Sequence, residues 1–277
     1  MNGAEALVRS LAGSGIDVCF TNPGTSEMHF VAALDRLDLI YCVLALQENM
    51  ATGAADGYAR MTGQPAATLL HLGPGFGNGL ANVHNAKKAR VPMINIVGEH
   101  ASYHIKYNAP LTSDIEAIVT PVSDYVVTSS HPDDVGTDAA RAVAQAKTWP
   151  GKIATMILPA DMAWSKTDIV GDGLLPDAPG RVVAEEVEAV AAALKSDKKA
   201  VMFCSGAVLI DPNLEKLGKV RAASGVDLIS QTSNRRIDRG AGRVVVDKLP
   251  YVVDLAIETL KDYDVIILVG TDEPVGF

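Results

Sequence analysis

The chain has 277 residues, of which 48% are hydrophobic and 21% are charged, proportions typical of a globular protein with a substantial core. A formal net charge of -9 without clustered lysine and arginine argues against a nucleic-acid-binding surface, and no apolar run is long enough to cross a membrane. The chain does not start with a basic segment followed by an apolar one, so we expect no signal peptide and a cytoplasmic location.

Helical and strand-like patterns alternate over the first part of the chain. Apolar residues at helical spacing predict helices at 4–12, 25–37, 48–62, 80–89 and 132–148. Short apolar runs predict strands at 16–20, 39–46, 66–72, 93–97, 122–128 and 153–158, of which 39–46 has the composition of a buried strand. This alternation predicts an α/β fold, a parallel sheet with helices on both faces.

A change in composition predicts a second domain. Residues 161–181 lose their periodicity and are rich in glycine, proline and aspartate, as in a linker. Beyond them we expect a Rossmann-like α/β region, with helices at 184–194, 213–223 and 251–261 and strands at 200–204, 226–229 and 265–269. Because the last strand lies close to Phe277, we expect this domain to be truncated, in a fragment, a split subunit or a natural truncation.

Acids and histidines follow several of the predicted strands. Glu48 stands where strand 39–46 gives way to a helix lined with small residues, and it is either a favourable acid at a helix N-terminus or a catalytic group. His71 and the pair Glu99-His100 also follow strands. Since the carboxyl ends of parallel strands lie at one edge of the sheet, we expect these groups to converge there as a site.

The histidines and cysteines show no metal-binding pattern. No cysteine is near the histidines in sequence, and the spacing of the histidines fits no short zinc motif, so we predict no metal ligand in this chain. The cysteines occur singly in apolar runs, which predicts buried free thiols at Cys19, Cys42 and Cys204.

A glycine-rich segment spans residues 73–79, between a predicted strand and a predicted helix. It is not the GxGxxG motif of nicotinamide-dependent dehydrogenases, and no phosphate-binding Gly-Lys-Ser follows. The glycines either form a phosphate site or let the backbone approach a ligand ring or a partner subunit closely, and the second interpretation is favoured.

Three motifs, taken in this order, resemble the pyrimidine-binding domain of thiamine diphosphate enzymes. They are Asn-Pro-Gly-Thr-Ser-Glu at 22–27, Gln-Glu-Asn-Met-Ala at 47–51 with Ala-Asp-Gly-Tyr-Ala-Arg at 55–60, and His-Leu-Gly-Pro-Gly at 71–75 with Gly-Asn-Gly at 77–79. The chain is most similar to the acetolactate synthase and benzoylformate decarboxylase group. The resemblance implies a pyrimidine-binding domain at 1–165, a linker at 166–183 and a truncated central domain at 184–277.

The resemblance also implies roles for individual residues. Glu48 would hydrogen-bond the pyrimidine ring of thiamine diphosphate and favour its imino form, whose exocyclic nitrogen removes the thiazolium proton. His71 would act as a proton relay. The implied cofactor-binding residues are Pro23, Gly24, Glu48, Gly73, Gly75 and Asn78, and the implied substrate-binding residues are Thr25, His71 and His100.

From this resemblance we expect a 2-oxo acid decarboxylase or carboligase, a lyase or transferase similar to acetolactate synthase large subunits. Two alternatives stay open: a benzoylformate-type decarboxylase without carboligation, and a non-catalytic or regulatory relative that keeps the fold. The synthases follow their fourth strand with Gly-Gln, whereas this chain has Gly98-Glu99-His100, which argues against acetolactate synthesis itself.

The resemblance further implies magnesium and diphosphate binding by a third domain with a Gly-Asp-Gly and Asn motif, which residues 185–277 lack. We therefore expect a second subunit, in a homodimer or homotetramer, to supply that half of the site, and these 277 residues alone to be inactive. Whether flavin binds the central domain is left open by the sequence.

Overall fold

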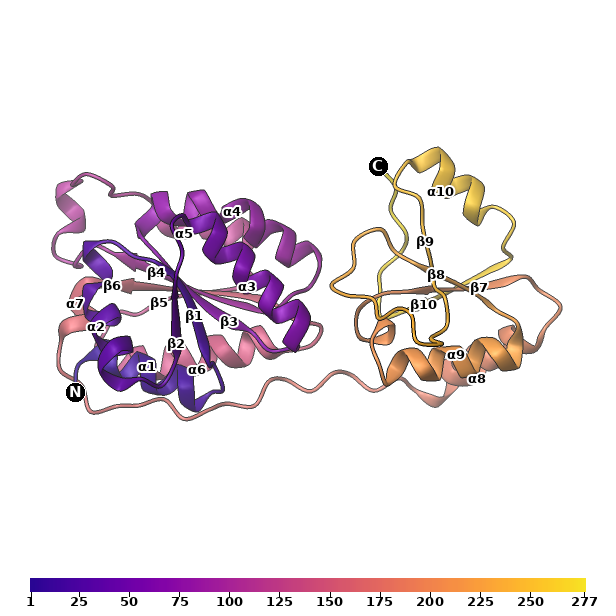
Figure 1. Ribbon diagram of the computed structural model, residues 1–277, viewed down its shortest axis with the longest axis horizontal. Coiled ribbons are helices and arrows are strands. Elements are labelled where there is room, and N and C mark those ends of the chain that lie inside the picture. Colours follow the sequence, from indigo (N-terminus) through magenta and orange to yellow (C-terminus); the bar gives the residue numbers. More distant parts are fainter. The chain divides into compact units, whose positions relative to one another are not determined.

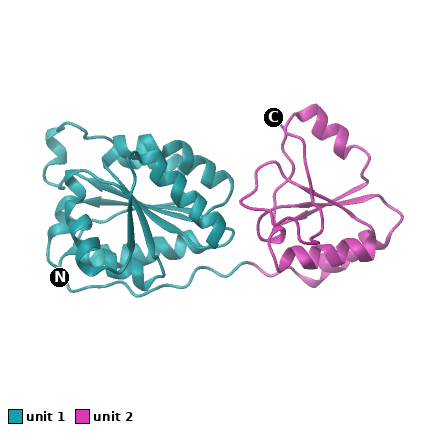
Figure 2. Ribbon diagram, viewed as in Figure 1, with its two compact units in different colours: residues 1–179 teal, residues 180–277 magenta.

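The computed structural model describes residues 1–277, which form two compact units, Met1–Pro179 and Gly180–Phe277 (Figure 2). No helix of this structure is both long and apolar enough to cross a membrane. Part of the predicted linker packs on the first unit: the buried backbone N–H of Gly171 donates to Ser10 Oγ at 2.8 Å. A side chain at position 171 would collide with the backbone of Gly136, so glycine is needed for this close approach.

The first unit is built on a six-stranded sheet in which every neighbouring pair is parallel. The strand order is β2-β1-β3-β4-β6-β5. The strands are β1 (Val18–Asn22), β2 (Tyr41–Leu44), β3 (Ala66–Leu70), β4 (Met93–Glu99), β5 (Tyr125–Thr128) and β6 (Ile153–Pro159). The predicted α/β class with a parallel sheet is therefore confirmed.

Helices cover both faces of this sheet (Figure 1). One apolar core lies under α1 (Gly3–Gly13), α2 (Met28–Leu37) and α6 (Asp134–Lys147), and α7 (Ala160–Trp164) packs beside them. A second core lies under α3 (Glu48–Thr62), α4 (Leu72–Lys88) and α5 (Ile115–Val119). Short 3-10 turns are η1 (Thr25–Glu27), η2 (Ile105–Tyr107) and η3 (Thr120–Val122).

The prediction that residues 39–46 form a buried strand was wrong. Strand β2 is only four residues long and lies at the edge of the sheet, where it pairs with β1 alone. Leu44 is 68% exposed, and Cys42 is also exposed, which contradicts the predicted burial of that thiol. An apolar run shows that a segment favours a strand, but its place in the sheet depends on contacts distant in sequence.

The glycine-rich segment, predicted to lie between a strand and a helix that begins at residue 80, is itself helical. Residues 73–79 form the first turns of α4, and strand β3 ends at Leu70 rather than at residue 72. Leu72 has a φ of 55°, in the left-handed region that is rare for residues other than glycine. This backbone turn between His71 and Gly73 costs on the order of 1–3 kcal/mol, and buried packing of the Leu72 side chain offsets it.

The second unit has a smaller parallel sheet in the order β10-β7-β8-β9. Its strands are β7 (Ala200–Cys204), β8 (Asp227–Ser230), β9 (Asp247–Lys248) and β10 (Val265–Val269). Helices α8 (Ala184–Lys195) and α9 (Asn213–Ser224) lie on one face and α10 (Val253–Leu260) on the other, with η4 (Gly206–Leu209) after β7 (Figure 1). Separate apolar clusters fill the two faces.

Candidate functional site

Glu48 is the first residue of α3, four residues after Leu44 at the end of the edge strand β2. The entry into the helix is held by Asn22 at the end of β1, whose amide donates to the carbonyl of Ala45 at 2.8 Å. The Glu48 side chain is 9% exposed, and its Oε2 accepts a 3.0 Å hydrogen bond from Asn78 Nδ2 in α4. Its Oε1 accepts no hydrogen bond from this chain, so one oxygen of an oriented, nearly buried carboxyl is available to a ligand.

Gly75 marks the point where Glu48 and His71 come together. An ideal Cβ at position 75 would lie 3.3 Å from Glu48 Oε1 and 3.4 Å from the Cβ of His71. Any larger side chain would fill the space beside the unpartnered carboxyl oxygen. About one turn further along α4, a Cβ at Gly79 would lie 2.8 Å from Thr52 Cγ2, which shows how closely α4 packs on α3.

His71 stands between β3 and α4, as the N-terminal flanking residue of that helix. Its Nδ1 lies 2.8 Å from Oε2 of Glu27, whose side chain is 1% exposed. The same oxygen accepts the backbone N–H of Gly24 at 2.7 Å. The register of the sheet explains the meeting, because the ends of β1 and β3 are neighbours, with Asn22 opposite Leu70.

Glu27 and Glu99 form a buried acidic pair beside this histidine. Burial raises the pKa of the Glu27 carboxyl, an effect only partly countered by the Gly24 N–H and by His71. Burial also raises the pKa of Glu99, and the nearby charge of Glu27 adds to the increase, while the backbone N–H of His100 donates to Glu99 Oε1 at 2.7 Å. Glu27 Oε1 is buried without a hydrogen-bond partner.

The other predicted site residues are divided between this cluster and its surroundings. Gly24 lies against the His71 ring, with its ideal Cβ 2.3 Å from Nδ1. Pro23 precedes it, and Thr25 is exposed at the start of η1. Gly73 points elsewhere, since its ideal Cβ would meet Ser113 and Ile118.

His100 lies at the same end of the sheet but outside the Glu48–His71 contacts. Its Nε2 is 3.2 Å from the carbonyl oxygen of Pro110, and its ring centroid is 5.6 Å from that of His104. The structure therefore brings Glu48, Asn78 and His71 together and leaves His100 in a separate polar group.

Sequence reasoning missed Glu27 as a site residue. Its position in the motif at 22–27, which follows β1, the neighbour of β3, was the available signal. An acid three residues after a glycine at the start of a helical segment is typical of a capping residue, and Glu27 does bind the Gly24 N–H. Burial and the contact with His71 depend on the tertiary fold.

The residues present fit the pyrimidine half of thiamine diphosphate. Glu48 Oε1 is oriented, unpartnered and bordered by the glycine surface at Gly75, which suits a flat ring with a hydrogen-bonding edge. No three His, Cys, Asp or Glu side chains gather in a way that could hold a metal ion.

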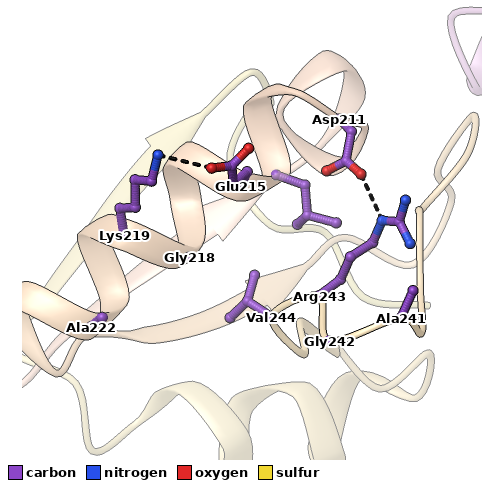
Figure 3. A pocket seen from close by; sticks show the side chains of 10 residues that line it. Asp211, Glu215, Gly218, Lys219, Ala222, Ala241, Gly242, Arg243 and Val244 are labelled. Atoms are coloured by element: carbon purple, nitrogen blue, oxygen red, sulfur yellow. Dashed lines mark hydrogen bonds and ion pairs between the residues drawn. The ribbon is translucent and has the colours of Figure 1, made fainter.

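A separate pocket of about 520 Å³ lies in the second unit, between α9 and the loop that carries Arg243 (Figure 3). Both cations at its rim are paired: Lys219 with Glu215 at 2.8 Å and Arg243 with Asp211 at 2.6 Å (Figure 3). Since these charges are neutralised, the pocket offers no free cation for a phosphate or carboxylate ligand.

Residues 1–118 match the family model described as "Thiamine pyrophosphate enzyme, N-terminal TPP binding domain". The chain is 47% identical, over all 277 residues, to a Mycobacterium tuberculosis protein named "Putative acetolactate synthase large subunit IlvX", and covers 53% of it. It is 29% identical over 236 residues, 83% of the chain, to the acetolactate synthase large subunit of Corynebacterium glutamicum, covering 37% of that protein.

Solved structures share the fold over the full chain. A thiamine diphosphate-dependent 4-hydroxybenzoylformate decarboxylase from Rhodococcus jostii RHA1 superposes with a TM-score of 0.83 at 19% identity, covering 100% of this chain and 54% of the other. The chain thus spans about half the length of the M. tuberculosis protein and of this decarboxylase. The predicted resemblance to thiamine diphosphate enzymes of the acetolactate synthase group is confirmed.

Proposed function

We propose that this chain, whose N-terminal unit belongs to the thiamine pyrophosphate enzymes, supplies the pyrimidine half-site of a 2-oxo acid decarboxylase or carboligase resembling acetolactate synthase. The observation that carries the proposal is the Glu48 carboxyl. One of its oxygens is fixed by Asn78 at 3.0 Å, and the other is unpartnered at the surface of Gly75. A group held in this way is set to accept a hydrogen bond from a ligand.

Glu48 would hold the aminopyrimidine ring through Oε1 and control the protonation state of that ring. When bound, thiamine diphosphate supplies the electron sink that decarboxylation of a 2-oxo acid needs. The protein's part is orientation: the nearly buried Glu48 side chain presents Oε1 beside Gly75, and Asn78 limits rotation of the carboxyl.

His71 would take up and return a proton at Nε2, since its Nδ1 faces Glu27. Thr25, exposed at the start of η1 next to the Gly24 that lies against His71, and His100 would bind the substrate. Pro23 and Gly24 would line the cofactor's ring, while Gly73, which packs on Ser113, would act on the cofactor through the backbone of α4 alone.

We assign residues 1–165 to the pyrimidine-binding domain, 166–183 to a linker and 184–277 to part of the central domain. Magnesium and the diphosphate would be held by a further domain on a second subunit of a homodimer or homotetramer. In that arrangement both halves of the site are required for turnover.

The direct test is Glu48→Gln in the full protein with its diphosphate-binding domain. Hydrogen–deuterium exchange at the thiazolium carbon of the bound cofactor should slow by about 10²–10⁴-fold, because loss of the acid removes control of ring protonation. Glu215→Gln is the matched control, since that exposed acid in the second unit pairs only with Lys219. Unchanged exchange in Glu48→Gln would leave Glu48 as a helix-end acid and the proposal would fail.

A benzoylformate-type decarboxylase without carboligation is the second candidate. It is favoured by the acid Glu99 where the synthases have glutamine, and by a histidine in contact with a buried acid at the end of β3. Product analysis with a 2-oxo acid separates the two: an aldehyde alone indicates simple decarboxylation, and a 2-hydroxy ketone or acid adduct indicates carboligation.

A further inference from the structure

Glu27 is a buried acid that the proposed function uses only as the neighbour of His71 Nδ1. Its side chain is 1% exposed and its Oε2 contacts two groups: the Gly24 N–H at 2.7 Å and His71 Nδ1 at 2.8 Å. Burying a carboxyl is costly unless its contacts compensate, and Oε1 has no hydrogen-bond partner. A residue kept under these conditions calls for an explanation beyond capping η1.

We infer that Glu27 is a positioning residue that fixes His71 as the Nδ1–H tautomer and so leaves Nε2 free to exchange a proton with the substrate. The inference rests on the proposed relay role of His71.

The hydrogen-bond directions at Oε2 support this tautomer. The backbone N–H of Gly24 can only donate, so Oε2 acts as an acceptor toward it. In the ionised carboxylate Oε2 also accepts from His71, which requires the proton on Nδ1. In the neutral acid a proton on Oε2 would donate to Nδ1 and select the opposite tautomer, because a carboxyl hydroxyl can also accept the Gly24 N–H. The ionised carboxylate is therefore the state that presents an acceptor to Nδ1 at 2.8 Å and fixes the Nδ1–H tautomer.

Two glycines give Glu27 and His71 the room for this contact. An ideal Cβ at Gly98 would lie 1.7 Å from Glu27 Oε1, and one at Gly24 would lie 2.3 Å from His71 Nδ1. The ends of three strands, β1, β3 and β4, thus approach one another around a single carboxyl–imidazole pair. The pair is enclosed by the fold on both sides, which limits rotation of the imidazole ring.

The titratable groups that face His71 and its neighbours are Glu27 on η1, which contacts the ring, and Glu99 on β4 with the adjacent His100. When His71 binds a proton at Nε2, its positive charge faces the Glu27 carboxyl and the Nδ1–H bond is kept. When His71 releases that proton, the same bond remains. The ring can therefore gain and lose one proton at Nε2 without turning, which is what a relay needs.

The test is ¹⁵N NMR of the full protein carrying ring-labelled histidine, without cofactor or substrate, with the His71 signals assigned by His71→Gln. The wild type should show a protonated Nδ1 and an unprotonated Nε2 at a pH where His71 is neutral. Glu27→Ala should shift the proton to Nε2, whereas Glu27→Gln, which keeps an acceptor oxygen, should preserve the wild-type tautomer. Turnover should fall about 100-fold in Glu27→Ala and less in Glu27→Gln.

The matched control is Glu5→Gln, because Glu5 caps α1 through the Asn2 N–H at 3.0 Å as Glu27 binds Gly24. It should leave the His71 spectrum unchanged. An Nε2–H tautomer in the wild type, or an unaltered tautomer in Glu27→Ala, would overturn the inference. If Glu27→Ala does not fold, Glu27→Leu, which fills more of the buried volume without an acceptor oxygen, takes its place with the same two outcomes. Normal turnover in His71→Gln would instead refute the relay role and leave the tautomer result standing.

Discussion

Replacing Gly24 by alanine displaces His71 while leaving every acid of the site in place. Gly24 has a φ of -118°, which alanine adopts freely, so the effect is purely steric. The new Cβ would lie 2.3–2.5 Å from Nδ1, Cε1 and Cγ of the His71 ring. Ordinary contacts begin near 3.5 Å, so the ring must retreat by about 1 Å. That movement breaks the 2.8 Å contact with Glu27.

Two magnitudes follow for Gly24→Ala. Overpacking together with loss of a hydrogen bond to an acid should lower the free energy of unfolding by about 1–3 kcal/mol. A catalytic group misplaced by about 1 Å should reduce kcat/KM about 100-fold, measured with the full protein and its 2-oxo acid substrate. Denaturant unfolding and steady-state kinetics report the two effects separately.

Gly13→Ala is the matched control, since Gly13 is exposed at the end of α1 and its ideal Cβ meets nothing within 4 Å. It should raise stability by about 0.5–1 kcal/mol without affecting kinetics. Retention of wild-type kcat/KM, within about twofold, by a folded Gly24→Ala protein would refute the argument that the position of His71 depends on this glycine.

Three further changes test other parts of the site. Asn78→Ala should weaken thiamine diphosphate binding, measured calorimetrically, by about 1–2 kcal/mol, because it frees the Glu48 carboxyl to rotate; equal affinity would contradict this. Burial raises the folded-state pKa of Glu99 above its unfolded value near 4.5, so its ionisation costs stability as pH rises through the folded pKa. Glu99→Gln should therefore raise Tm at neutral pH but not below about pH 4.5, and a pH-independent gain would refute the titration argument. Among the cysteines, Cys42 alone should react with a thiol reagent in the native protein, since burial raises the pKa of the other two, and peptide mapping of modified sites checks this.

The sequence was sufficient to predict the parts of the site that depend on residues close together in the chain. Glu48 and His71 could be placed at strand ends because an apolar run followed by small or glycine-rich residues predicts a strand-to-helix transition. Their convergence follows from parallel pairing of neighbouring strands. Asn78 was predicted only as a cofactor-binding residue. Its hydrogen bond to Glu48 could not be predicted, because the two residues are 30 positions apart and lie on different helices.

The glycine-rich segment shows where propensity fails. Each glycine costs a helix about 1 kcal/mol relative to alanine, which favours a loop at 73–79. The helix forms nevertheless because several of these glycines permit close packing, as Gly79 does on Thr52 and Gly73 on Ser113. Glu27 shows the opposite case: its capping contact is local, whereas its contact with His71 spans 44 residues and requires the assembled sheet.

The strap formed by residues 165–171 has a consequence for the order of folding. The carbonyl of Ser165 accepts the Gly3 N–H at 3.0 Å, and Gly171 donates to Ser10 across 161 residues. Closing a loop of that length costs about 4–5 kcal/mol of chain entropy. We therefore expect the hydrogen bonds between α1 and residues 165–171 to form late in folding. During synthesis α1 is made well before the strap, so the backbone N–H of Gly3 and the hydroxyl of Ser10 gain these partners only after all six strands of the first sheet have been synthesised.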